Sequence, residues 1–160
     1  MAQADFILGE FKRKLDERYR LSIPTEFVES LTEQGEELIL VKERPGCLSL
    51  WNSNQWQGKL DAGVNLVRAK IEAGKLAGRV AEVQLLGRLL STRQRQIKLA
   101  AKNRLSIPEG FREFLKAEPD SELMITGAAV CVEIWRHDAW LSSLEENIPQ
   151  FQGLLDQLSG

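Results

Sequence analysis

The stretch Arg20-Leu21-Ser22-Ile23-Pro24 occurs a second time, without a gap, as Arg104-Leu105-Ser106-Ile107-Pro108. The offset of 84 residues extends well beyond this motif. Residues 6–56 and 90–140 share 13 identities over the 51 positions compared, and the identities include both cysteines and all four tryptophans of the chain. Chance would supply only a few matches, so the chain contains two copies of one small unit.

The repeated motif predicts a short strand followed by a helix. Arg20 and Ser22 alternate with Leu21 and Ile23, which is the pattern of a strand with one polar and one apolar face. Pro24 then stands where a helix can begin, because proline suits the first helical position. The second copy repeats these residue types at the same spacing. Each copy should therefore expose its arginine and bury its aliphatic side chains.

Further alternating or apolar runs predict the remaining elements of each unit. The expected strands are Phe11–Leu15, Leu38–Val41 and Leu48–Trp51 in copy one, and Arg93–Leu99, Leu123–Thr126 and Val130–Trp135 in copy two. A helix should begin near Trp56 and near Trp140. The predicted organisation is a first unit at residues 6–56, a helical connector at 57–89, a second unit at 90–140 and a C-terminal tail at 141–160. Gly74 and Gly78 are expected to form the turn between two connector helices.

The predicted fold class is α+β, with two β units related by a pseudo-two-fold axis. A half of about 50 residues buries too small a core to be stable alone. If the two halves pack together, each covers the apolar face of the other. The same kind of surface can also mediate association between chains, so we expect a homo-oligomer.

Composition sets limits on location and chemistry. The chain of 160 residues is 43% hydrophobic and 28% charged, as globular proteins are. Its apolar runs are far shorter than the ~20 residues that a membrane span requires, so we expect a cytoplasmic protein. Cys47 and Cys131 are too few and too isolated for a disulfide framework or a metal site, and they should be core residues. No cofactor is expected.

Basic residues gather around both copies of the motif, although the whole chain has a formal charge of -2. Residues 12–20 carry a net charge of +3, and residues 93–104 carry +5 with no acidic residue. Local basic strands and turns of this kind suit DNA binding, because lysine and arginine neutralise phosphates and a protruding arginine can reach base edges. The alternative is that these charges only protect edge strands from aggregation.

The motifs also resemble a known family. Phe6, Gly9-Glu10-Phe11, Leu15-Asp16 and the first motif resemble the start of the MraZ family of bacterial regulators, which consist of two AbrB-like swapped-hairpin units forming a pseudo-two-fold barrel. Residues 79–87 resemble the helix that precedes the second unit of that family. The resemblance implies a DNA-binding repressor or activator that forms a ring-like homo-oligomer. It also implies double-stranded DNA targets with short direct repeats, in the promoter of a cell-division and cell-wall gene cluster, and a nucleoid-associated protein.

The resemblance assigns roles to individual residues. The Asp-x-x-x-Arg motif of the family corresponds to Asp16 and Arg20, which implies that Arg20 contacts DNA and that Asp16 orients it. Arg104 is the counterpart of Arg20 in copy two. The other expected DNA contacts are the basic residues nearby in each copy, namely Arg18, Lys14, Lys12, Lys102 and Lys98.

Two departures from the family pattern concern the turns. Ala100 replaces the aspartate in copy two, so the second unit is expected to bind phosphates more than bases. Tyr19 and Asn103 replace the glycine that normally precedes each arginine. Asparagine tolerates a positive φ and tyrosine does so poorly, so the first turn is expected to have a different shape.

Two other function classes compete with DNA binding. An assembly module that binds protein partners in the manner of an antitoxin would use the repeat and the tryptophans but would not need basic turns. An enzyme would need a nucleophile with a base, and Cys131 with His137 is the only such pair. Copy one has Cys47 and Ser53 at those positions, so we expect no catalysis. The tryptophans are expected to fill the core or an interface.

Overall fold

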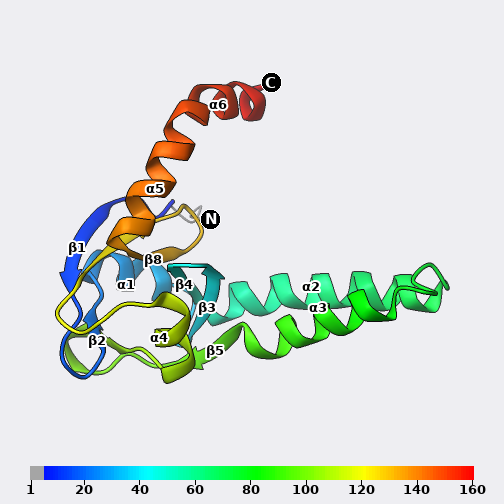
Figure 1. The fold of residues 1–160 in the computed structure, drawn as a ribbon, viewed down its shortest axis with the longest axis horizontal. Helices are drawn as coiled ribbons and strands as arrows, with labels where there is room; N and C mark the ends of the chain where they lie inside the picture. The colour runs from blue at the N-terminus through cyan, green and yellow to red at the C-terminus, as the bar shows by residue number, and fades with distance from the viewer. Residues whose placement is uncertain (1–5) are drawn as a thin grey trace.

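The structure, a computed structural model, describes residues 6–160. Its strands are β1 (Glu10–Lys14), β2 (Arg20–Ser22), β3 (Leu38–Arg44), β4 (Cys47–Asn52), β5 (Gln94–Ile97), β6 (Arg104–Ser106), β7 (Glu122–Gly127) and β8 (Val132–Arg136). Its helices are α1 (Thr25–Thr32), α2 (Ser53–Glu72), α3 (Val80–Thr92), α4 (Glu109–Leu115), α5 (His137–Asn147) and α6 (Phe151–Ser159) (Figure 1). This mixture confirms the predicted α+β class.

The helix predicted after each motif is present and begins directly after its proline. Pro24 precedes α1, and Pro108 precedes α4. Each helix then buries two residues spaced four apart, which are Phe27 with Leu31 in α1 and Phe111 with Leu115 in α4. This spacing places both side chains on the same face, which packs onto the strands.

The strands of the two halves are interleaved in one antiparallel sheet, and the halves share a second, two-stranded ribbon. The order in the large sheet is β1-β7-β8-β4-β3-β5, and the ribbon pairs β2 with β6. The first strand of each copy pairs with a strand of the other copy, β1 with β7 and β5 with β3. Because the pairing crosses between copies, neither half contains the complete sheet.

The strand register has a two-fold pattern at two places. In the ribbon, Leu21 lies opposite Leu105, which is its own counterpart at the offset of 84. In the middle of the large sheet, Ser49 of β4 lies opposite its counterpart Glu133 of β8. A pseudo-two-fold axis that relates the copies therefore passes through both pairs.

One hydrophobic core lies between the ribbon and the large sheet. It contains side chains from both copies, among them Leu21, Leu105, Phe27 and Phe111. On the other face of the sheet, Trp51 packs on Trp56 with ring centroids 5.3 Å apart, and Trp135 packs on Trp140 at 5.4 Å. Both cysteines are buried. These contacts confirm that the tryptophans and cysteines are packing residues.

The sheet does not close into a barrel. Within residues 6–160, β1 and β5 are the two edges of the six-stranded sheet, and the ribbon is a separate hydrogen-bonded unit. The predicted pseudo-two-fold barrel is therefore not confirmed, because the hydrogen bonding gives an open sheet and a separate two-stranded ribbon.

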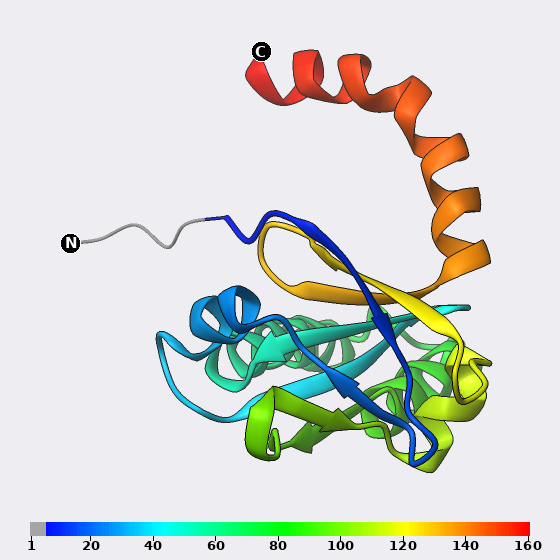
Figure 2. The same ribbon diagram turned by 90° about the vertical axis from the view of Figure 1, so that its left-hand side faces the viewer.

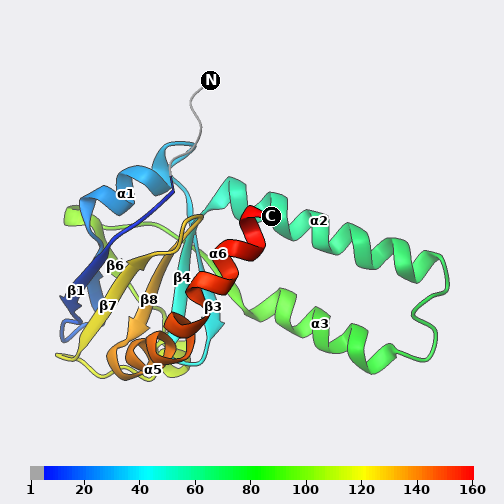
Figure 3. The ribbon, with the colours of Figure 1, turned by 90° about the horizontal axis from the view of Figure 1, so that it is seen from above.

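Two helical arms project from this body in different directions (Figures 1 and 3). The first is the hairpin of α2 and α3, and its turn contains Gly74 and Gly78 at φ of 71° and 82°, as predicted. The second consists of α5 and α6, which rise from the body and bend at the short 3-10 turn Ile148–Gln150 (Figure 2). The tail is therefore helical as far as Ser159.

Candidate nucleic-acid interface

The ribbon of β2 and β6 presents the two motif arginines on one face. Leu21 and Leu105 are fully buried, whereas the residues on either side of them in each strand are partly or fully exposed. Arg20 lies opposite Ser106, and Ser22 lies opposite Arg104. Arg20 and Arg104 are thus diagonal neighbours, with Cα atoms about 7–8 Å apart. The prediction that the arginines point away from the core is confirmed.

Asp16 holds the first turn and its arginine together. One carboxylate oxygen of Asp16 accepts hydrogen bonds from the backbone N–H groups of Arg18 and Arg20, each at 2.8 Å. The other oxygen accepts from Nε of Arg20, also at 2.8 Å. The hydrogen bond from the Arg20 backbone N–H is the main reason that the pKa of Asp16 lies below its ordinary value. The charged carboxylate therefore limits the directions that the Arg20 side chain can take.

Tyr19 adopts the positive φ that was not expected of a tyrosine. Its φ is 58°, close to the 56° of its counterpart Asn103. The backbone of Tyr19 donates to the carbonyl of Asp16 and accepts from the N–H of Ile107, both at 3.0 Å. The Arg112 guanidinium lies 4.2 Å from the centre of the Tyr19 ring. These contacts offset the steric cost of the left-handed conformation.

The second turn has the same closing hydrogen bond but less side-chain support. The N–H of Ala100 donates to the carbonyl of Arg104 at 2.8 Å, as Asp16 does to Arg20 at 3.0 Å. Because Ala100 has no carboxylate, Nε of Arg104 donates instead to the carbonyl of Ala101, at 3.3 Å. Lys102 also has a positive φ, of 63°, which makes the two turns differ in shape.

The remaining predicted DNA contacts lie on the strands and turns that lead to the ribbon. Lys12 and Lys14 are exposed on the edge strand β1, and Lys98 is exposed just after the other edge strand, β5. Arg18 and Lys102 are exposed within the two turns. The structure thus brings Arg20 and Arg104 together, while these five residues flank them.

Sequence reasoning missed the residues that support the turns from a distance. Arg112 of α4 contacts Tyr19 of the other copy, and Asn103 donates to Thr25 Oγ1 across the copies at 3.4 Å. Neither contact follows the repeat, because Arg112 corresponds to Val28 and Thr25 to Glu109. Only the swapped arrangement of the halves brings these residues together.

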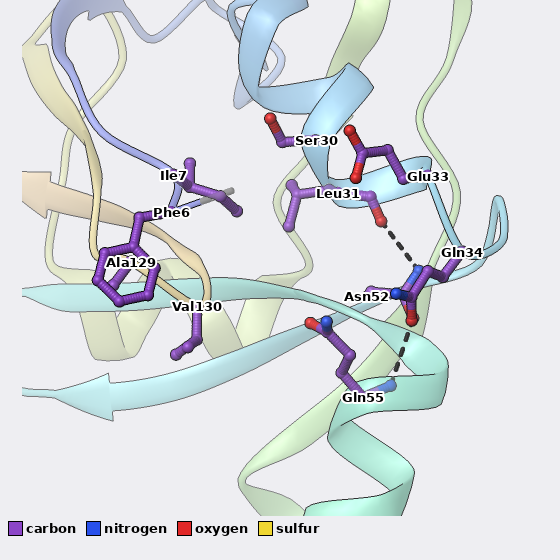
Figure 4. A pocket seen from close by; sticks show the side chains of 10 residues that line it. All are labelled: Phe6, Ile7, Ser30, Leu31, Glu33, Gln34, Asn52, Gln55, Ala129 and Val130. Atoms are coloured by element: carbon purple, nitrogen blue, oxygen red, sulfur yellow. Dashed lines mark hydrogen bonds between the residues drawn. The ribbon is translucent and has the colours of Figure 1, made fainter. Parts of the chain in front are cut away.

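A small cavity beside α1 and the start of α2 offers no comparable chemistry (Figure 4). Asn52 lies at its wall and is buried, and its side chain already bonds to four backbone groups. It donates to the carbonyls of Leu31 and Gly35 and accepts from the N–H groups of Asn54 and Gln55. Asn52 therefore acts as the helix cap of α2.

Cys131, the residue that an enzyme would need as its nucleophile, has an unreactive thiol. Burial raises the pKa of its thiol to about 12, so the thiol stays protonated at neutral pH. In the part of the chain that the structure describes, no three His, Cys, Asp or Glu side chains are grouped to hold a metal ion. None of the helices between residues 6 and 160 is long and apolar enough to cross a membrane.

A family model described as "MraZ protein, putative antitoxin-like" matches residues 6–64 and 91–153. This chain belongs to the MraZ family. The two matched segments cover both copies of the repeat and leave out most of the α2–α3 hairpin.

Relatives in this family match almost the whole chain. A protein of Syntrophomonas wolfei named Transcriptional regulator MraZ is 26% identical over 94% of this chain and 95% of its own length. Relatives with the same name from Alkaliphilus metalliredigens and Thermus thermophilus are each 27% identical. They cover 83% and 86% of this chain, and 82% and 87% of their own lengths.

Proposed function

We propose that this chain is a sequence-specific DNA-binding transcriptional regulator that uses the ribbon of β2 and β6 as its DNA contact surface. The observation that carries the proposal is the position of Arg20, which is held by Asp16 on the exposed face of the ribbon beside Arg104. A two-stranded ribbon can enter the major groove, where an arginine can bond to guanine. The names of the MraZ relatives support a regulator.

The flanking basic residues have a second role in this proposal. Lys12, Lys14 and Arg18 on one side, and Lys98 and Lys102 on the other, bind the phosphates along the groove. Such contacts fix the position of the protein on the duplex without reading its sequence. The proposed target is a set of short direct repeats in the promoter of a cell-division and cell-wall gene cluster. The proposed location is the cytoplasm, in association with the nucleoid.

We further propose that the copies, at residues 6–56 and 90–140, are AbrB-like swapped-hairpin units arranged as a barrel-like sandwich. The connector at 57–89 and the tail at 141–160 lie outside them. The cross-copy pairs β1 with β7 and β5 with β3 support this organisation. In the assembled protein, several such units bind successive repeats of one DNA site, which favours a closed homo-oligomer.

A salt titration tests the proposed interface. Binding to the DNA upstream of the gene for this protein is measured for wild type, Arg20→Ala and Arg104→Ala. Each lost phosphate contact lowers the log-log salt slope by roughly 0.9, and loss of a base contact lowers the preference for the specific site. Lys75→Ala, at an exposed lysine beyond the end of α2, is the control. The site assignment fails if specific binding survives both arginine changes.

A specific observation favours the second candidate function, an oligomeric assembly module without sequence-specific DNA binding. Large apolar side chains are exposed along both helical arms. The same titration decides between the functions, because an assembly module would bind specific and scrambled DNA equally weakly and would respond to neither arginine change.

A further inference from the structure

Most of the large apolar side chains that the structure exposes lie on the two helical arms. The hairpin arm of α2 and α3 exposes Leu66, Ile71, Val80, Leu85 and Leu89. The C-terminal arm of α5 and α6 exposes Leu141, Ile148, Phe151, Leu154, Leu155 and Leu158. Exposed apolar surface of this extent marks an interaction site.

The arms cannot cover each other within one chain. The hairpin arm extends sideways from the body, whereas α5 rises from another side and α6 turns across above the body, well apart from the hairpin (Figures 1 and 2). Helices α3, α5 and α6 contain no buried residue. A helix gains most of its stability from burial of its apolar face, so these faces require a partner outside the chain.

The two arms carry opposite charge. Residues 53–92 of the hairpin arm contain six Lys or Arg and three Asp or Glu, which gives a net charge of +3. Residues 137–159 of the C-terminal arm contain four Asp or Glu and no Lys or Arg. Surfaces of opposite sign attract and orient each other on association. The acidic C-terminal arm of one chain is therefore best complemented by the basic hairpin arm of a second chain.

The hairpin arm also offers a groove where an apolar helix can lie. A cavity of about 220 Å³ opens between the base of α2 and the end of α3, and its apolar wall includes Leu60, Leu86 and Leu89. Lys59 and Arg93 supply positive charge at this groove. Trp56, which is buried and lines the groove, has no acceptor for its Nε1–H among residues 6–160. This nitrogen is itself buried, so the groove presents its apolar wall and its positive charge to an occupant.

The last helix has the features that this groove requires. Phe151, Leu154, Leu155 and Leu158 follow the i, i+3, i+4, i+7 spacing of one helical face, and all four are exposed. Asp156 lies within the same helix, and two glutamates precede it near the end of α5. An amphipathic helix in an apolar groove is a common mode of protein recognition.

We propose that the C-terminal arm of one protein chain docks in the α2–α3 groove of a second chain of the same protein. The inference rests on the homo-oligomer of the proposed function and assigns its two surfaces. Because the two surfaces differ, the contact is heterologous. Each chain inserts its C-terminal arm into the groove of one neighbour and binds the C-terminal arm of another neighbour in its own groove. Such a contact repeats from chain to chain and forms a ring when the rotation closes.

Two double variants test this pairing. Leu154→Asp with Leu155→Asp destroys the apolar face of the C-terminal arm, and Leu86→Asp with Leu89→Asp destroys the groove. Light scattering after size-exclusion chromatography, at micromolar protein, should give an oligomer for wild type and a single chain for each double variant. Val130→Asp, at an exposed apolar residue outside both arms, is the control and should keep the wild-type mass.

The equimolar mixture of the two variants gives the sharpest result. The Leu154→Asp, Leu155→Asp variant keeps an intact groove, and the Leu86→Asp, Leu89→Asp variant keeps an intact C-terminal arm. One contact can therefore form between them, and the mixture should yield a heterodimer and nothing larger. The proposal is overturned if wild type is a single chain, if either variant alone keeps the wild-type mass, or if the mixture stays monomeric. Circular dichroism checks folding, and Leu→Gln pairs at the same positions replace a variant that does not fold.

A salt series tests the charge complementarity of the arms, and an arginine variant separates this proposal from the proposed function. Raising the salt concentration should weaken the wild-type assembly, because it screens the opposite charges of the arms. Arg20→Ala should keep the wild-type mass, because Arg20 lies on the ribbon and outside both arms. If Arg20→Ala abolishes specific DNA binding but leaves assembly intact, the two properties belong to different surfaces.

Discussion

The two turns that precede β2 and β6 have nearly the same backbone connections but different side-chain support. Each is closed by a hydrogen bond to its motif arginine, and each has a left-handed residue just before that arginine. In copy one, however, Asp16 bonds to both the backbone and the side chain of Arg20, whereas Ala100 leaves Arg104 with one bond of 3.3 Å to a carbonyl. The two turns therefore share their backbone conformation before the arginine but differ in the groups that bind the arginine side chain.

This difference predicts unequal effects of the two arginines on DNA recognition, which is the largest effect expected. Arg20→Ala should reduce the preference for the specific site by about 1–3 kcal/mol, or about 5- to 150-fold, because a base contact is lost. Arg104→Ala should weaken binding to specific and scrambled DNA alike. Competition binding with both DNAs measures the ratio. Equal loss of specificity in the two variants would show that the turns are functionally equivalent.

The carboxylate can be removed from copy one and added to copy two. Asp16→Ala should lower specific affinity by roughly tenfold and leave binding to scrambled DNA unchanged, because Arg20 remains but loses its orientation. Ala100→Asp should raise the specificity contributed by Arg104, which is measured as the effect of Arg104→Ala in that background. If Ala100→Asp has no effect on specificity, the carboxylate is not the feature that separates the turns.

The support of Tyr19 by Arg112 predicts a smaller effect, on stability. Arg112→Ala should lower the free energy of unfolding by about 1 kcal/mol, because it removes the contact with the Tyr19 ring and the hydrogen bond to the carbonyl of Ile107. Urea unfolding measures the change. A loss confined to DNA binding would place Arg112 in the interface instead.

The smallest predicted effect is on the pH dependence of stability, and it concerns Glu133, which lies at the pseudo-two-fold axis. Burial raises the pKa of Glu133, the counterpart of Ser49, above its ordinary value. The folded protein thus favours the protonated acid, and the stability contributed by Glu133 falls as pH rises through the ordinary carboxyl range to the raised pKa. Glu133→Gln should therefore stabilise the protein at pH 7 more than at pH 4, while its amide oxygen still accepts from Trp135. Equal stabilisation at both pH values would contradict this explanation.

Much of the local structure could be predicted, because each strand and helix follows from residues close in sequence. Alternation predicted β2 and β6, proline marked the start of α1 and α4, and glycines marked the hairpin turn. The φ of Tyr19 could not be predicted in this way. Its intrinsic preference is against the left-handed region, and the bond from Ile107 and the ring contact with Arg112 come from the other copy.

By itself, the sequence determined that the protein is a duplicated α+β unit with an arginine on the polar face of each motif strand. These features depend on spacings of a few residues, and they hold in any fold that buries Leu21 and Leu105. Only the tertiary structure decided that Leu21 lies opposite Leu105, that Arg20 and Arg104 share one surface, and that both arms lack a partner within the chain. The physical reason is that side-chain alternation selects a face of a strand but not its neighbour. The neighbour is selected by burial of the one core that both copies share.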